Sequence, residues 1–207
     1  MLALVLDTST PAVSAGLVRV GARTELLSER VVVDGRRHGE LLAAGMQAVL
    51  TAGRPDVVVV GVGPGPFTGL RVGIMTAAAF GAAKDLPVLG VCSLDGLGGA
   101  STAAVTDARR KEVYWAAYDA EGERVDGPHV TTPAVARAAL EGLRVVGDGA
   151  VLYGFATDSD PRYPVVSRLA EVAVRRHLRG LPALPLTPLY LRRPDAIEPS
   201  TLKKVAG

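Results

Sequence analysis

Short runs of apolar residues, separated by turn signals, occupy the first half of the chain. Residues 2–7, 13–18 and 24–33 predict an antiparallel meander of three strands. Residues 57–60 are an unbroken β-branched run, and residues 87–91 form a further apolar run. Unbroken runs of this kind are typical of strands whose two faces are both covered. The pattern therefore predicts a meander followed by parallel strands that are joined through helices.

The two helices expected between these strands, at residues 40–50 and 68–84, lack the polar face of a surface helix. Small residues recur every four positions along the second helix, namely Gly69, Gly73, Ala77 and Gly81. Such a row lets another backbone approach closely. Because the sheet covers only one side of each helix, we expect the other side to dock on a partner protein.

The second half of the chain repeats the start of the first half in outline. Residues 103–107 and 113–118 predict two strands, and the first of them ends at Asp107 as residues 2–7 end at Asp7. In both halves a strand, an aspartate, a turn and a strand follow one another. This order indicates two lobes of related design.

The rest of the second half contains fewer elements. We expect a short helix from Thr132-Pro133 to Leu140, a short strand at residues 145–146 and an amphipathic helix at residues 165–178. Prolines recur between residues 181 and 188 and predict an extended segment or linker there, and the tail from Asp195 shows no apolar periodicity. We divide the chain into a first lobe, residues 1–98, which carries the two apolar helices, and a smaller second lobe, residues 99–207, with the proline-rich C-terminal segment.

Composition supports a compact α/β protein. Of the 207 residues 48% are hydrophobic and 21% are charged, which is enough for a packed core and argues against disorder. The single cysteine, Cys92, excludes an internal disulfide and lies in an apolar run, as an inert buried thiol does. A formal charge of +2 with scattered arginine pairs gives no basic block for nucleic acid. The apolar start reaches Asp7 without a basic segment, so we expect no signal peptide, no membrane span and a cytoplasmic protein.

Asp7, Thr8 and Ser9 are weak candidates for a cofactor site. In actin-like kinases and chaperones the first hairpin often reads Asp-x-Gly-Thr, and its glycine lets backbone N–H groups approach nucleotide phosphates. Here Ser9 stands where that glycine would be, and its side chain hinders the approach. We favour the alternative in which Asp7 closes the turn by hydrogen-bonding to Ser9 or Thr10.

The glycine-rich segment at residues 63–69 precedes a helix, as a phosphate-binding loop does. It contains no Gly-Lys-Ser/Thr, and its prolines remove backbone donors, so a tight strand-to-helix turn with Thr68 near the N-cap fits better. His38 begins the first helix, but Leu42 stands one turn on, where a metal site needs its second ligand. We expect no metal site and no catalytic residue.

This glycine-rich segment is also the most distinctive stretch of the sequence. It reads Gly-Pro-Gly-Pro-Phe-Thr-Gly-Leu-Arg-Val-Gly from Gly63 to Gly73. It resembles the Gly-Pro-Gly-Ser-Phe-Thr-Gly-hydrophobic-Arg signature of the bacterial TsaB family, also called YeaZ, with Pro66 in place of the serine. Further segments agree with that family in order and spacing: residues 6–9, 38–42, 107–109, 112–116 and 188–192. The resemblance covers nearly the whole chain.

The resemblance implies an α/β, two-lobed actin-like fold (ASKHA, ribonuclease H-like) with mixed sheets and a reduced second lobe. It implies a non-catalytic subunit that binds and activates the catalytic subunit TsaD. Together with the ATPase TsaE, that complex transfers threonylcarbamoyl to the adenosine beside the tRNA anticodon. The resemblance also implies tRNA contact only through the complex, no cofactor in the isolated chain, ATP or ADP only together with partners, and a homodimer through the same helical face.

The expected partner interface lies on the two apolar helices. It consists of His38, Leu41, Leu42, Gly69, Arg71, Val72, Gly73, Met75, Thr76 and Ala77. For Arg71 two roles stay open, support of a phosphate site in the partner or pairing with a carboxylate at the interface. Three other functions stay open as alternatives: a stand-alone actin-like phosphotransferase that binds ATP, a glycoprotease-like metallopeptidase, and a stand-alone RNA-binding domain. The last is weakened by the near-neutral charge and by the lack of an aromatic stacking platform in the sequence.

Overall fold

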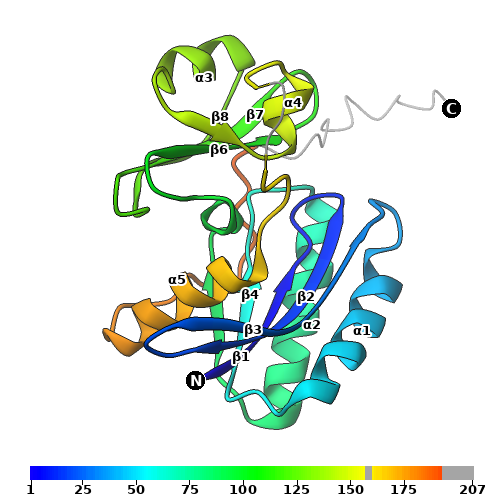
Figure 1. Cartoon of the computed structure of the whole chain (residues 1–207). Coiled ribbons are helices and arrows are strands. Elements are labelled where there is room, and N and C mark those ends of the chain that lie inside the picture. The colour runs from blue at the N-terminus through cyan, green and yellow to red at the C-terminus, as the bar shows by residue number, and fades with distance from the viewer. Residues whose placement is uncertain (157–159, 193–207) are drawn as a thin grey trace, which may run out of the picture.

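The computed structural model describes residues 1–156 and 160–192, and in it the chain forms two α/β lobes, one above the other in Figure 1. Each lobe is built around its own sheet, with helices against it. The tail from Asp195, for which the sequence predicted no periodic element, lies outside the described residues.

The first sheet has five strands in the order β3-β2-β1-β4-β5. Strand β2 is antiparallel to both β1 and β3, whereas β4 runs parallel to β1 and β5 runs parallel to β4. The predicted meander followed by parallel strands is confirmed. The strand bounds are β1 Leu2–Asp7, β2 Ala12–Val20, β3 Thr24–Val33, β4 Val57–Gly61 and β5 Val88–Val91.

Both faces of this sheet carry a hydrophobic core, because successive side chains of a strand point to opposite faces. On one face Leu4 and Leu6 pack beneath α1 and α2, and on the other Ala3 and Val5 pack against α5. The helices are α1 (His38–Val49), α2 (Phe67–Lys84) and α5 (Val166–Leu178), and a short turn of 3-10 helix, η1 (Leu50–Ala52), follows α1.

The second sheet follows the same plan on a smaller scale. Its order is β8-β7-β6-β9, with β6, β7 and β8 antiparallel and β9 parallel to β6. The elements are η2 (Ser93–Gly96), β6 (Thr102–Asp107), β7 (Val113–Tyr118), β8 (Arg124–Thr131), α3 (Pro133–Ala139), β9 (Arg144–Val146) and α4 (Asp148–Leu152). Strand β8 was not predicted from the sequence, because Gly127 and Pro128 interrupt its pattern; an edge strand tolerates them.

Helix α5 corrects the division of the chain at residue 98. The sequence analysis assigned everything from residue 99 on to the second lobe, yet Val166, Leu169 and Val174 are fully buried against the first sheet. The proline-rich stretch returns to the first lobe as well, since Leu184 pairs with Gly90. The physical reason is that β1 and β4 are apolar on both faces, so the second face needs a cover that only the C-terminal part of the chain supplies.

The row of small residues on α2 faces the interior of its own lobe. A Cβ atom on Gly69 would lie 2.5 Å from the Thr8 carbonyl oxygen, and one on Gly73 would overlap Thr8 Oγ1. Ala77 is fully buried, as is Leu42 on α1. The close backbone approach is therefore made by this chain's own first hairpin. Gly69, Gly73, Ala77 and Leu42 are corrected from interface residues to core residues.

We expect Gly69→Ala to destabilise the fold, because the added methyl group meets the Thr8 carbonyl oxygen at 2.5 Å and only a shift of the hairpin relieves that contact. The free energy of unfolding should fall by about 2 kcal/mol. The matched control is Gly39→Ala on α1, where a Cβ meets nothing within 4 Å and alanine favours the helix. Urea denaturation measures both variants, and equal stabilities would contradict the packing described here.

Candidate functional site

The turn after β1 is closed by its own side chains. Asp7 Oδ1 accepts hydrogen bonds from the Ser9 N–H at 2.9 Å and from Ser9 Oγ at 2.7 Å. This confirms the expected bond between Asp7 and Ser9. The same turn recurs in the second lobe, where Asp107 Oδ1 accepts a hydrogen bond from the Arg109 N–H at 2.8 Å. The strand-aspartate-turn-strand repeat is therefore present in both lobes.

This turn packs directly onto the glycine-rich loop and the start of α2. Thr8 Oγ1 donates to the Gly69 carbonyl at 2.7 Å, and a Cβ on Gly65 would overlap the Ser9 carbonyl oxygen. Thr8 and Ser9 are 1% and 3% exposed. In a phosphate site the backbone N–H groups of such a turn point at the ligand, whereas here the Ser9 N–H is bonded to Asp7.

Asp7 itself is a buried carboxyl with an incomplete set of partners. The residue is 1% exposed, and Asp7 Oδ2 has no hydrogen-bond partner among the described residues. Burial raises the pKa of Asp7, and the hydrogen bonds from Ser9 oppose that rise. The side chain is therefore an electrostatic cost to the fold when it is charged.

A cavity of about 660 Å³ opens between the two lobes, at the start of α2. Segments far apart in the sequence line it: the first hairpin, the loop before α1, the start of α2, the β6–β7 turn and the segment near Tyr190. We call this cavity the interlobe cleft. His38 lies in its wall, with Nε2 3.2 Å from the Thr10 carbonyl oxygen, so this histidine ties α1 to the first hairpin.

The rim of the interlobe cleft carries an aromatic pair. The rings of Phe67 and Tyr190 are stacked, with centroids 5.0 Å apart and an interplanar angle of 18°. The guanidinium carbon of Arg71 lies 5.1 Å from the Phe67 ring centroid. Helix α2 begins at Phe67 after an N-cap at Pro66, and no side chain caps it. Thr68, which was expected near the N-cap, is the second residue of the helix.

The sequence analysis missed this pair, although both residues belong to segments that it quoted. No local spacing joins Phe67 to Tyr190, because the second lobe separates them along the chain. The one feature that could have indicated the pair is that a single aromatic residue stands in each segment: Phe67 after a run of glycine and proline, and Tyr190 between leucines. The statement that the chain lacks an aromatic platform is therefore corrected.

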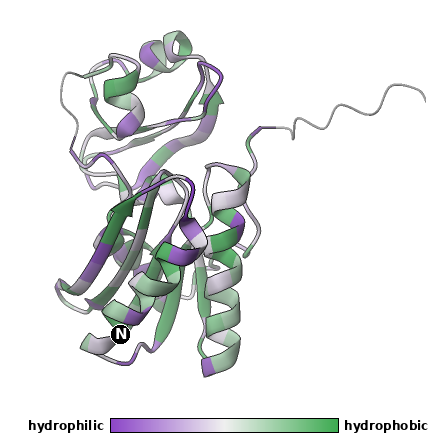
Figure 2. Cartoon of the chain, turned by 90° about the vertical axis from the view of Figure 1, so that its right-hand side faces the viewer, coloured by the Kyte–Doolittle hydropathy of each residue, from purple (hydrophilic) through white to green (hydrophobic). Residues whose placement is uncertain are grey.

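The outward sides of α1 and α2 form an apolar surface. Met75 on α2 is 64% exposed, and further exposed apolar residues are Ala79 on the same helix and Ala43, Ala44 and Ala48 on α1. We call these five residues the α1–α2 face. Figure 2 shows α2 coloured hydrophobic over most of its length. Of the other predicted interface residues, Arg71 is exposed and Leu41, Val72, Thr76 and His38 are partly buried.

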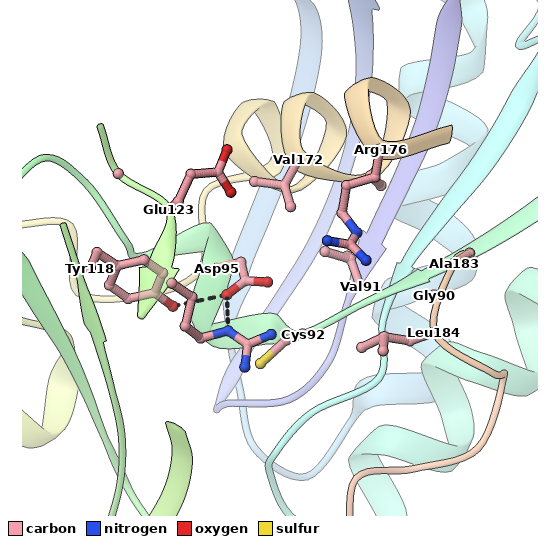
Figure 3. A pocket seen from close by; sticks show the side chains of 13 residues that line it. Gly90, Val91, Cys92, Asp95, Tyr118, Glu123, Val172, Arg176, Ala183 and Leu184 are labelled. Atoms are coloured by element: carbon pink, nitrogen blue, oxygen red, sulfur yellow. Dashed lines mark hydrogen bonds and ion pairs between the residues drawn. The ribbon is translucent and has the colours of Figure 1, made fainter. Parts of the chain in front are cut away.

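A second, smaller cavity of about 120 Å³ lies where η2, β7 and α5 meet (Figure 3). Asp95 Oδ1 accepts hydrogen bonds from Arg124 Nε at 2.8 Å and from the Tyr118 hydroxyl at 3.0 Å. Burial raises the pKa of Asp95, and Arg124 opposes that rise. Burial also raises the pKa of the Cys92 thiol to about 12, as expected of an inert thiol. The bonds of Asp95 therefore attach η2, which lies between the two lobes in the chain, to β7 and β8 of the second sheet.

Within residues 1–156 and 160–192, no group of three or more His, Cys, Asp and Glu side chains is arranged to hold a metal ion. Within the same residues, no helix has the length and apolar character needed to cross a membrane.

The two sheets share a plan, an antiparallel meander extended by a parallel strand or strands, and a cleft lies between them. This arrangement defines an α/β protein of the two-lobed actin-like class. The chain belongs to the TsaB (YeaZ) family. It is 30% identical over 224 residues to the tRNA threonylcarbamoyladenosine biosynthesis protein TsaB of Haemophilus influenzae, covering 91% of this chain and 92% of that protein.

Other comparisons agree with this family. The structure of YeaZ from Pseudomonas aeruginosa matches with a TM-score of 0.75 at 26% identity, over 92% of this chain and all of that one (100%). An uncharacterized protein of Mycobacterium tuberculosis is 48% identical over 205 residues, covering 93% of this chain and 92% of that protein. Residues 36–149 match the family model of TsaD, described as tRNA N6-adenosine threonylcarbamoyltransferase.

We expect Asp7→Asn to raise the free energy of unfolding at pH 7 by about 1 kcal/mol, because it removes a buried charge and keeps the acceptor for Ser9. The folded-state pKa of Asp7 lies above the unfolded value, so the folded state binds more protons and the wild type loses stability as pH rises above that unfolded value. The gain from the variant should therefore shrink toward pH 4. Urea denaturation at pH 4 and pH 7 measures it, and a variant that is less stable than wild type at pH 7 would contradict the prediction.

Proposed function

We propose that the chain is a non-catalytic subunit of the machinery that makes threonylcarbamoyladenosine in tRNA. In this proposal it binds and activates TsaD, the threonylcarbamoyltransferase, and the ATPase TsaE acts with the pair. Membership of the TsaB family supports the pathway, since the Haemophilus influenzae relative is named for threonylcarbamoyladenosine biosynthesis.

One observation carries the subunit role, namely the apolar α1–α2 face. The inward side of α2 is engaged by the first hairpin, and its outward side presents Met75 and alanines, with Arg71 and Lys84 as its charged residues. Exposed apolar residues on two neighbouring helices are typical of a protein–protein interface. Residues 36–149 match the TsaD family model, which supports the idea that the proposed partner has a related fold.

The alternatives from other classes find less support. A stand-alone phosphotransferase needs the first hairpin to receive phosphates, and this hairpin is bonded to itself and covered by α2. A metallopeptidase needs ligand side chains, and His38 is bonded to the Thr10 carbonyl with Leu42 in the core one turn on. We therefore propose no cofactor for the isolated chain, with ATP or ADP held only in the complex with its partners.

Met75→Glu should weaken pairing with TsaD while the subunit stays folded, because Met75 is 64% exposed and its replacement puts a charge on the α1–α2 face. We expect association to weaken about tenfold or more. Size-exclusion chromatography with light scattering measures the one-to-one species, and transfer of threonylcarbamoyl to tRNA by the mixture measures activation. Neither protein should carry out the transfer at full rate alone.

Leu178→Glu is the matched control, since Leu178 is 65% exposed on α5, on the opposite side of the sheet. It should pair and activate like wild type. Wild-type pairing by Met75→Glu would rule out the α1–α2 face as the interface. A wild-type chain that forms only a homodimer with Met75 buried, and never a complex with TsaD, would rule out the subunit role.

A further inference from the structure

We propose that the rim of the interlobe cleft contacts RNA, with arginine and lysine side chains on its phosphates and the Phe67–Tyr190 pair beneath a base. This inference rests on the proposed function, because it takes the RNA to be the tRNA on which the complex acts. Phe67 and Arg71 lie on the same exposed side of α2 as Met75. The test variants are therefore placed on other segments of the rim, and their pairing with TsaD is measured alongside tRNA binding.

The cations of the rim come from segments that are scattered in the sequence. Arg36 precedes α1 and Arg109 lies in the β6–β7 turn, and both line the interlobe cleft. Lys111, two residues on, is exposed in the same turn. Arg71 lies at the aromatic pair on the same rim. Folding therefore gathers charges that the sequence shows only as isolated pairs.

The carboxylates around this rim are already engaged. Asp107 accepts a hydrogen bond from the Tyr153 hydroxyl at 2.9 Å and pairs with Arg109 at 3.2 Å. Glu112 pairs with Arg192, and Glu40 pairs with Arg37 at 2.9 Å. These pairs also engage Arg109, Arg192 and Arg37. The excess positive charge of the rim therefore comes from Arg36, Arg71 and Lys111, which form no ion pair with a carboxylate of the described residues.

The β6–β7 turn holds its cations in an unusual backbone conformation. The φ values are positive at three successive residues: 62° at Arg109, 52° at Arg110 and 62° at Lys111. Residues other than glycine rarely adopt this region. Two backbone hydrogen bonds of 3.0 Å fix the turn. The Glu112 N–H donates to the Arg109 carbonyl, and the Ala108 N–H donates to the Glu112 carbonyl. Strained turns of this kind persist where the surroundings hold them and are frequent at binding sites.

The aromatic pair supplies the second element of an RNA surface. Phe67 is 50% exposed and Tyr190 is 41% exposed, so the two stacked rings are not buried in a core and remain open to solvent. Single-stranded nucleic acids bind through stacking of bases on exposed aromatic rings beside a positively charged path. The rim of the cleft has both parts next to each other.

A mononucleotide fits these observations less well than RNA. Its phosphates would need the first hairpin, which is bonded to itself and covered by Gly65 and Gly69. The cations lie on the open rim instead, and Arg109 has 69% of its side chain exposed. Such an arrangement suits a polymer that lies across the rim more than a ligand enclosed in a pocket.

The test uses the reconstituted complex of this chain with TsaD and a fluorescently labelled, unmodified tRNA. The charge-reversal variant is Arg36→Glu with Lys111→Glu. Its matched control is Arg23→Glu with Arg54→Glu, two exposed arginines that precede β3 and β4 and do not line the interlobe cleft. Anisotropy titrations at several salt concentrations should show binding about tenfold weaker for the first variant, with a salt slope lower by about 2. The control should stay within about twofold of wild type.

The stacking element is tested in the same assay. Tyr190→Ala should weaken tRNA binding about fivefold, and Tyr190→Phe should bind like wild type. Light scattering establishes that each variant still pairs with TsaD.

Wild-type tRNA affinity in charge-reversal complexes that still pair would overturn this inference and leave the proposed function intact. Unchanged tRNA affinity together with loss of Mg²⁺-ATP binding would overturn it in favour of a nucleotide site. Failure of the wild-type chain to pair with TsaD would overturn the proposed function, and this inference with it.

Discussion

The contact between the first hairpin and the glycine row of α2 is the constraint on which the rest of the first lobe depends. Thr8 lies against Gly69 and Gly73 at a distance that any side chain at those positions would block. The contact fixes the rotation of α2 about its own axis, since residues four apart share one side of a helix. With Gly69, Gly73 and Ala77 turned inward, Met75 and Ala79 must face outward. The α1–α2 face is thus a geometric consequence of how the hairpin packs.

The same contact makes the turn after β1 differ from the related turn after β6. Asp7 and Asp107 each accept a hydrogen bond from the backbone N–H two residues later. In the first lobe α2 covers that turn, and Ser9 is 3% exposed. In the second lobe the corresponding residue is Arg109, whose side chain is 69% exposed at the interlobe cleft. The same type of turn is therefore buried in the first lobe, where it forms part of the wall of the interlobe cleft, and exposes a positive charge in the second lobe.

Much of the fold was predictable because its strands carry strong local signals. Residues 57–60 are β-branched and covered on both faces, and the structure places β4 there. The failures concern which surfaces meet. The period of α5 predicts a helix, but nothing local tells which sheet it covers. The glycine row predicts a close approach of some backbone, and the sequence does not say that Thr8 provides it. Phe67 and Tyr190 meet only because the chain returns to the first lobe after completing the second.

The composition of the α1–α2 face fits the proposed role of a subunit that folds before it meets its partner. The free energy lost by exposing apolar surface is proportional to the area exposed, at about 25 cal/mol per Å². Ala43, Ala44, Ala48 and Ala79 each expose little area, so leaving them in water costs the isolated chain little. Met75 is the large apolar side chain of this face and is 64% exposed. In an interface, alanines let two helices approach closely, and a flexible methionine fills the gap that remains. The energy of pairing is therefore expected to be concentrated at Met75, with the alanines setting the distance between the helices.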